Sequence, residues 1–194
     1  MALINDVFAG WRGDPNIAIG GNVYALTILL RIRAGFAGEL RAAARALPRD
    51  PGPFGSLSRT HFARLVVLDR LAFEGPAQDA PDVRGQFLLF TAVIDGKECH
   101  DYLRDLWNDG GDELRAIWGR CENAPSDDDD APVFVRWMLR RQITTRAFFR
   151  DYDGTVAEVQ AALELRRQVR EFALRTQYFT APDLYKAFTQ EFPA

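Results

Sequence analysis

Lysine is scarce in this 194-residue chain, and so are cysteine, histidine and long apolar runs. Lys97 and Lys186 are the only lysines among 24 basic residues, and 27 acidic residues leave a formal charge of -3. That balance excludes a nucleic-acid binder built on a net basic surface. The cysteines, Cys99 and Cys121, have no CxxC spacing, so the sequence signals neither a disulfide framework nor a zinc knuckle.

No apolar run is long enough to cross a bilayer, and residues 1–16 lack a basic start followed by a long apolar stretch. We therefore expect a soluble, cytoplasmic protein that does not bind a membrane. Hydrophobic residues make up 47% of the chain, which is enough for a sizeable core. We expect one domain, with an N-terminal arm over 1–21, a core over 22–154, and a C-terminal helix and aromatic tail over 155–194.

Alternating apolar residues predict strands at residues 22–33, 61–69 and 86–95. The second and third are expected to form an antiparallel pair, joined by a long polar connection over 70–85. Helical spacing of apolar residues predicts a helix between the first two strands, closed by Pro48. Further helices are expected after the third strand, including a helical insertion over 111–141.

Residues 143–152, ITTRAFFRDY, predict a fourth strand. Thr155 and Glu158 then have the spacing of a capping box before a helix over 156–174. This order of elements is that of an α+β, ferredoxin-like (βαββαβ) antiparallel sheet with extra helices after the second crossover. Such a sheet has helices on one face, so a second copy, the tail or a ligand should cover the other face.

Acidic side chains and histidines offer few ligands for a metal. We interpret the aspartates at 127–130 as the solvated start of a helix, because Pro132 follows them. His100 lies in the sequence Glu98-Cys99-His100-Asp101, shortly after Asp95, and these residue types can bind a divalent metal. Adjacent helical residues point in different directions, however, so this group favours a helix start and we expect no metal.

His61 begins the second predicted strand, where a histidine can act as an acid, a base or a ligand of a metal or haem. The alternative is a hydrogen-bonded structural histidine. Since His61 and His100 are the only possible histidine ligands, the sequence gives little support for haem, and we expect no cofactor.

Three arginines alternate out of the apolar faces of the predicted strands. They are Arg31, Arg64 and Arg146. If they share the open face of the sheet with Thr27 and Thr91, they could bind a carboxylate or a phenolate. The alternative is that they pair with acids across a dimer interface.

Several segments resemble an uncharacterised bacterial family of the ferredoxin-like, dimeric α/β barrel group. They are HFARLVVLD (61–69), LLFTAVIDG (88–96), YLRDL (102–106), DELRAIWG (112–119) and RRQITTRAFFRDYDGTV (140–156). The group also contains dye-decolourising peroxidases, chlorite dismutases, small monooxygenases and polyketide cyclases. The resemblance covers about residues 61–174 and implies a dimer that joins two sheets; it implies no particular activity.

The chain departs from that family at two motifs. Val93 and Ile94 stand where the family pattern has Asn-Tyr before Asp-Gly, and Arg141-Gln142 stands where it has His-Gln. Ala92 also breaks the G-x-x-D-G motif of dye-decolourising peroxidases, which weakens a peroxidase interpretation.

We therefore expect a homodimer that binds a small organic anion and is an oxidoreductase or cyclase-like enzyme, although the sequence alone does not decide whether it is an enzyme. In this hypothesis the arginines orient the anion, and His61 or Tyr102 moves a proton. The alternative is a non-catalytic module that docks a partner through the open sheet face and the aromatic tail.

Overall fold

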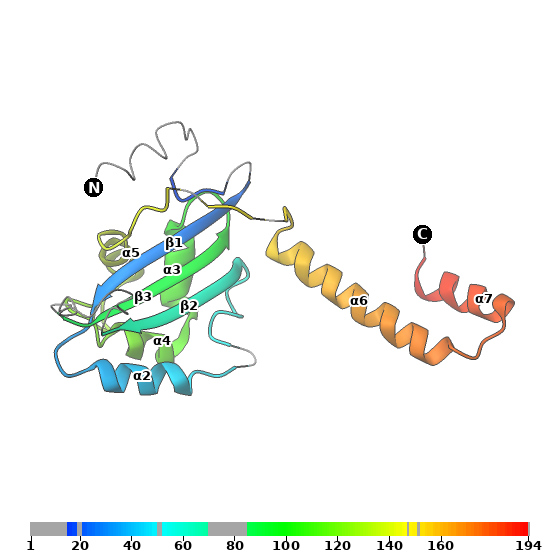
Figure 1. Cartoon of the computed structure of the whole chain (residues 1–194), viewed down its shortest axis with the longest axis horizontal. Helices are drawn as coiled ribbons and strands as arrows, with labels where there is room; N and C mark the ends of the chain where they lie inside the picture. Colours follow the sequence, from blue (N-terminus) through cyan, green and yellow to red (C-terminus); the bar gives the residue numbers. More distant parts are fainter. Residues whose placement is uncertain are drawn as a thin grey trace, which may run out of the picture. The chain divides into compact units, whose positions relative to one another are not determined.

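The computed structural model describes residues 15–18, 21–49, 52–69, 85–146, 148–150 and 152–193 (Figure 1). Residues 1–14 of the expected N-terminal arm and 70–84 of the expected connection lie outside these residues. The chain forms two compact units, Met1–Asp153 and Gly154–Ala194, and is an α+β protein. The first unit contains β1 (Val23–Arg31), α2 (Ala37–Ala46), β2 (Thr60–Leu68), β3 (Phe87–Asp95), α3 (His100–Asp109), α4 (Gly111–Trp118) and α5 (Ala131–Leu139).

The sheet has three antiparallel strands in the order β1-β3-β2. All three lie where the alternation of apolar residues predicts them, and the expected antiparallel pairing of β2 with β3 is confirmed. The register places Leu26 opposite Ala92 and Ile28 opposite Phe90, so the fully apolar positions of neighbouring strands share one face.

The core lies between that face and the helices, which Figure 1 shows behind the sheet. Phe90 in the central strand is fully buried and packs against Trp118 of α4, with 5.3 Å between ring centroids. Trp107 of α3 stacks on Phe134 of α5 at 4.8 Å. Asp130 caps α5 by accepting a hydrogen bond from the Val133 amide, which confirms the interpretation of the aspartates as a helix start.

On the opposite side of the sheet, the described residues of the first unit form no helix (Figure 1). We call this side the open face. Its side chains, identified by register, are Val23, Ala25, Thr27, Leu29, Arg31, Phe62, Arg64, Val66, Leu68, Phe87, Leu89, Thr91, Val93 and Asp95.

The predicted fourth strand does not form in the part of 143–152 that the structure describes. Three short segments divide the outer edge of β1 instead. Asn16 accepts from the Ala25 amide at 2.7 Å, Arg141 accepts from the Leu29 amide at 3.1 Å, and the Glu122 amide donates to Arg31 at 2.8 Å. Because the edge is already shared, pairing with the predicted strand ends after the Ile143 amide has bonded to Thr27.

After this contact the chain crosses the sheet. The Thr145 hydroxyl lies 3.5 Å from the Thr27 hydroxyl of β1, and Tyr152 reaches His61 of β2. Since β1 and β2 are the two outer strands, Thr145 and Tyr152 lie beside opposite edges of the sheet.

The second unit contains α6 (Val156–Thr176) and α7 (Ala181–Glu191). The capping box at Thr155 and Glu158 is confirmed, with both reciprocal hydrogen bonds present. The expected tail forms α7, whose side packs on Phe172 of α6 through Phe188 and Phe192, with ring centroids 5.9 and 5.5 Å away.

Candidate functional site

His61 lies at an irregularity in β2. Thr60 pairs with Ile94 and Phe62 pairs with Val93, so His61 is the additional residue of a β-bulge. A bulge changes the direction in which a strand presents its side chains. Ile94 is fully buried in the core, and the next residue, Asp95, therefore points to the open face.

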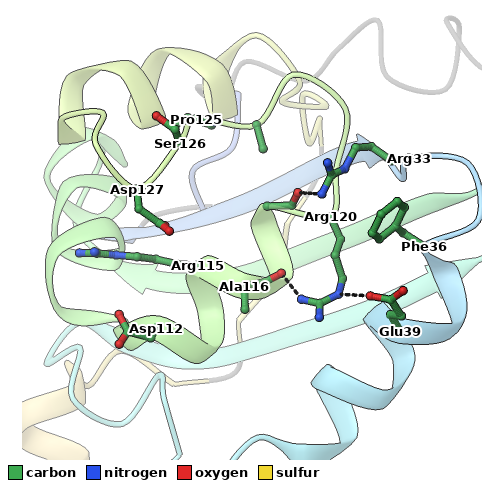
Figure 2. Close-up of a pocket in the computed structure, with 12 residues that line it drawn as sticks. Arg33, Phe36, Glu39, Asp112, Arg115, Ala116, Arg120, Pro125, Ser126 and Asp127 are labelled. Atoms are coloured by element: carbon green, nitrogen blue, oxygen red, sulfur yellow. Dashed lines mark hydrogen bonds and ion pairs between the residues drawn. The ribbon is translucent and has the colours of Figure 1, made fainter.

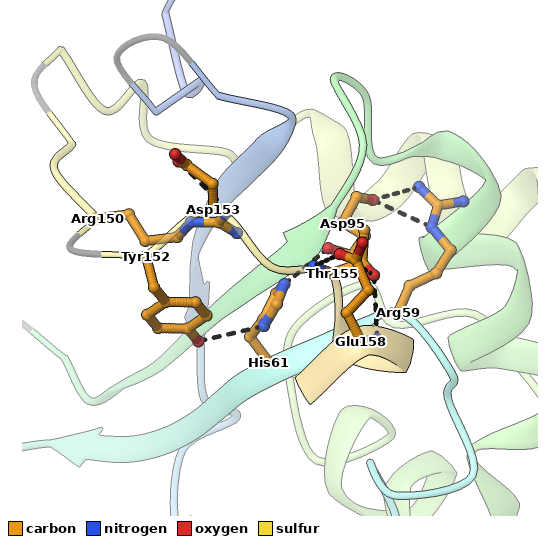
Figure 3. Close-up of polar contacts among 8 residues, drawn as sticks. All are labelled: Arg59, His61, Asp95, Arg150, Tyr152, Asp153, Thr155 and Glu158. Atoms are coloured by element: carbon orange, nitrogen blue, oxygen red, sulfur yellow. Dashed lines mark hydrogen bonds and ion pairs between the residues drawn. The ribbon is translucent and has the colours of Figure 1, made fainter. Parts of the chain in front are cut away.

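The imidazole of His61 meets the carboxylate of Asp95 at this end of the sheet (Figure 3). The distance between His61 Nε2 and Asp95 Oδ1 is 2.7 Å, and the two side chains are 5% and 19% exposed. Arg59 fixes the backbone of Asp95, because its Nε and Nη2 donate to the Asp95 carbonyl at 3.2 and 3.0 Å. These two hydrogen bonds fix the backbone at the end of β3, and the Asp95 carboxylate is thereby held against the imidazole.

The other ring nitrogen of His61 faces a phenol. Tyr152 Oη lies 3.3 Å from His61 Nδ1, and the ring centroids are 5.9 Å apart in an edge contact. When His61 Nε2–H donates to the Asp95 carboxylate, Nδ1 of the neutral imidazole accepts, and the Tyr152 hydroxyl is the donor to it. Asp95, His61 and Tyr152 form a chain of hydrogen bonds that we call the relay.

The relay joins a protected group to an accessible one. His61 is almost completely buried, whereas Tyr152 is 49% exposed. A ligand on the open face can therefore touch the phenol, while the imidazole behind it is protected from water. The guanidinium of Arg150 lies 4.9 Å from the centroid of the Tyr152 ring, and its side chain is only 9% exposed.

The expected anion-binding residues are placed in two groups. Thr27, Thr91 and Arg64 pair across the three strands, so they share one row of the open face. Arg31 lies at the far end of β1, opposite Phe87, and its Nε is 3.4 Å from Glu122. Arg146 is exposed and follows Thr145 on the segment that crosses the sheet.

Tyr102 lies on the side of the sheet opposite to the relay. It belongs to α3, is 1% exposed, and its hydroxyl receives a hydrogen bond of 3.4 Å from Thr60. Burial raises the pKa of Tyr102 to about 12. A buried phenol that holds its proton so firmly is poorly suited to proton transfer at neutral pH, so we give Tyr102 no role at the site.

Sequence reasoning singled out His61 but missed its partners. Antiparallel pairing brings the start of β2 beside the end of β3, so the contact of His61 with Asp95 could have been predicted from the two expected strands. Tyr152 and Arg150 were both assigned to a fourth strand, and no nearby residue in the sequence predicts their position beside His61.

A separate cavity of about 720 Å³ lies beside α4 (Figure 2). Three arginines line it, and each guanidinium donates to a carbonyl at the end of a helix: Arg33 to Gly119, Arg120 to Ala116 and Arg115 to Trp107. Cations there oppose the negative end of the helix dipole. These arginines therefore have a structural role.

Within the described residues, no three His, Cys, Asp or Glu side chains are grouped so that they could hold a metal ion. In the group Glu98-Cys99-His100-Asp101, Cys99 is buried, whereas His100 and Glu98 are exposed and lie 3.4 Å apart. No described helix is long and apolar enough to span a membrane. Comparison of the chain with protein-family models, curated proteins and solved structures finds no match.

Proposed function

We propose that the chain binds a small organic anion on the open face of the sheet and that the relay moves a proton to or from it. One observation carries this proposal: a buried imidazole lies between a carboxylate at 2.7 Å and a half-exposed phenol at 3.3 Å. A catalytic base needs a group to orient it and an outlet to the ligand, and the relay contains both.

The proposed step runs through Tyr152. Its oxygen takes a proton from the ligand while its own proton moves to His61 Nδ1. The imidazolium formed in this way is stabilised by the Asp95 carboxylate at Nε2. The ligand has then lost one proton, Tyr152 is neutral again, and reversal of the step returns the proton to the ligand. Of the two expected reaction classes, a cyclase-like reaction is the one that needs only such a transfer.

The proposed fold is the ferredoxin-like one, in which residues 141–143 take the place of the fourth strand. The hydrogen bonds of Arg141 and Ile143 to β1 support this assignment, because they are antiparallel and lie on the outer edge. We keep a cytoplasmic location as part of the proposal.

Deuterium exchange tests the proposed activity without knowledge of the natural ligand. Phenylpyruvate and acetoacetate each carry an acidic C–H group and a carboxylate, and NMR in D2O follows the loss of that proton signal. We expect the wild-type protein to accelerate exchange above the buffer rate and His61→Gln to lose about 100-fold or more of the acceleration. His100→Gln is the matched control, because His100 is the only other histidine and is 65% exposed. Equal acceleration by His61→Gln and wild type, or none by either, would contradict the proposal.

The second unit favours a second candidate function, the docking of another protein, for which we take a second copy of this chain. Large apolar side chains remain exposed on it: Leu163, Leu165, Val169, Leu174, Tyr178, Phe179, Leu184, Tyr185 and Phe188. Contiguous exposed apolar surface commonly marks an interface. Light scattering should then give a dimer for wild type and a monomer for Tyr178→Ser combined with Tyr185→Ser; a monomeric wild type contradicts docking between copies.

A further inference from the structure

Within the described residues, the buried guanidinium of Arg150 has only a distant, solvated carboxylate near it. The Arg150 side chain is 9% exposed, and its Nη1 atom has no hydrogen-bond partner among the described residues. In the described part of the chain, only Asp153 brings a carboxylate within 4.0 Å, with Oδ1 3.9 Å from Nη2, and the Asp153 side chain is fully exposed. A solvated carboxylate at this distance compensates little for the burial of a guanidinium.

Other arginines of the first unit show what a structural role looks like in this protein. Arg59 donates to the carbonyls of Asp95 and Glu98, and Arg115 donates to the carbonyl of Trp107 through Nε and Nη2. Each guanidinium stabilises a turn or the end of a helix. No such carbonyl contact is recorded for Arg150 in the described part of the chain, so backbone stabilisation does not account for its burial.

The position of Arg150 relates it to the relay. Its guanidinium lies over the ring of Tyr152, 4.9 Å from the centroid, and the hydroxyl of the same ring is bonded to His61. Figure 3 shows these side chains at the end of the sheet where Asp95 lies. The cation and the proton-moving oxygen are thus separated by one aromatic ring.

We propose that Arg150 anchors the ligand of this site and that the ligand is a small carboxylic acid. This inference rests on the proposed function. The planar fork of a guanidinium matches the two oxygens of a carboxylate, and burial strengthens the pair. The ligand carboxylate replaces the distant, solvated Asp153 at Nη2, and the guanidinium turns so that Nη1, which is inaccessible to solvent in this structure, becomes the second donor. The acidic hydrogen of the ligand then lies at the Tyr152 hydroxyl.

This assignment differs from the expectation that Arg31, Arg64 and Arg146 bind the anion. All three are exposed, and Arg31 already lies within 3.4 Å of Glu122. An exposed guanidinium remains hydrated, so exchanging its water for a carboxylate gains less than completing a buried one.

NMR titration with benzoate tests the anchor on the intact protein. We expect benzoate to shift the side-chain signals of His61 and Arg150, whereas benzamide, its neutral counterpart, leaves them unchanged. Phenyl phosphate distinguishes a carboxylate site from a general oxyanion site, and equal or tighter binding of it overturns the carboxylate assignment. Arg150→Gln should lose tenfold or more in benzoate affinity. Arg45→Gln is the control, since Arg45 is exposed on α2.

The outcomes separate the anchor from the proposed function. Unchanged benzoate affinity in Arg150→Gln, or a loss in Arg64→Gln alone, overturns the anchor. If deuterium exchange still depends on His61 but not on Arg150, the proposed function stands and this inference falls. Arg150→Lys is a second variant that keeps the positive charge but removes the planar guanidinium, so it tests the site without removing the cation. Intermediate benzoate affinity with an unchanged melting temperature supports the anchor. Wild-type benzoate affinity contradicts a site that requires the planar guanidinium.

Discussion

The imidazole of His61 and the carboxylate of Asp95 are in contact although 34 positions separate them in the chain. Two features of the sheet create this contact. Antiparallel pairing brings the first residues of β2 beside the last residues of β3, and the bulge at His61 directs its side chain to the face on which Asp95 lies. The pair therefore depends on strand register and not on a flexible loop.

Replacing Asp95 by Asn tests what the carboxylate does for His61. The amide can still accept a hydrogen bond, but it cannot stabilise an imidazolium. We expect deuterium exchange to fall by about 100-fold, comparable with the contribution of a positioned base, while the melting temperature changes little. Exchange at the wild-type rate in Asp95→Asn would show that the carboxylate has no part in proton transfer.

Replacing Tyr152 by Phe removes one oxygen and leaves the ring. The aromatic contact with Arg150 is retained, so the fold should be unaffected. If the phenol is the group that touches the ligand, exchange should fall as far as it does in His61→Gln. Phe149→Leu is the matched control, because Phe149 is 69% exposed and belongs to the same segment. The same loss in both variants would indicate a disturbed segment instead of a lost proton carrier.

Gly96 should be required for the position of Asp95. Its φ of +108° lies in the region that favours glycine, and an added Cβ would lie 3.0 Å from Arg59 Nη2, which braces the Asp95 carbonyl. We expect Gly96→Ala to lower the free energy of unfolding by about 1–2 kcal/mol. It should also shift the NMR signals of His61. Gly38→Ala, at a helical position with free space around it, should not destabilise the protein.

The alkaline stability of the first unit should depend on Tyr102. Burial raises its pKa to about 12 from the ordinary 10.0, so the folded chain retains a proton that the unfolded chain releases. The unfolded state binds fewer protons between these values, and the free energy of unfolding therefore falls as the pH rises from 10 to 12. A tenfold difference between the acidity of Tyr102 in the folded state and in the unfolded state corresponds to about 1.4 kcal/mol in the free energy of unfolding.

Chemical denaturation at pH 8 and pH 11 measures this effect. Tyr102→Phe removes the titrating group and should lose less stability than the wild type between the two pH values. Parallel losses in the two proteins would show that Tyr102 does not contribute. Cys121, whose pKa is also raised to about 12 by burial, should account for part of the loss that remains.

The features that were predicted correctly depend on residues close together in the sequence, and the features that were missed depend on residues far apart in it. The strands, the capping box of α6 and the helix start at Asp130 follow from residues within a few positions of one another, and all are confirmed. The prediction of a fourth strand was wrong because Asn16 and Glu122, which are distant in sequence, already form hydrogen bonds with the edge of β1 on which that strand would pair. Tyr152 was missed for the same reason: its contact with His61 spans 91 positions.

The tautomer and the proton of His61 test the account most directly. A long-range ¹H–¹⁵N spectrum of the wild-type protein, with His100→Gln to assign the signals, identifies which ring nitrogen carries hydrogen. The relay predicts that neutral His61 is protonated at Nε2 and bare at Nδ1, and that Tyr152→Phe shifts the Nδ1 signal. A proton on Nδ1 in neutral His61, or a spectrum unchanged by both Asp95→Asn and Tyr152→Phe, would contradict the relay and the function proposed from it.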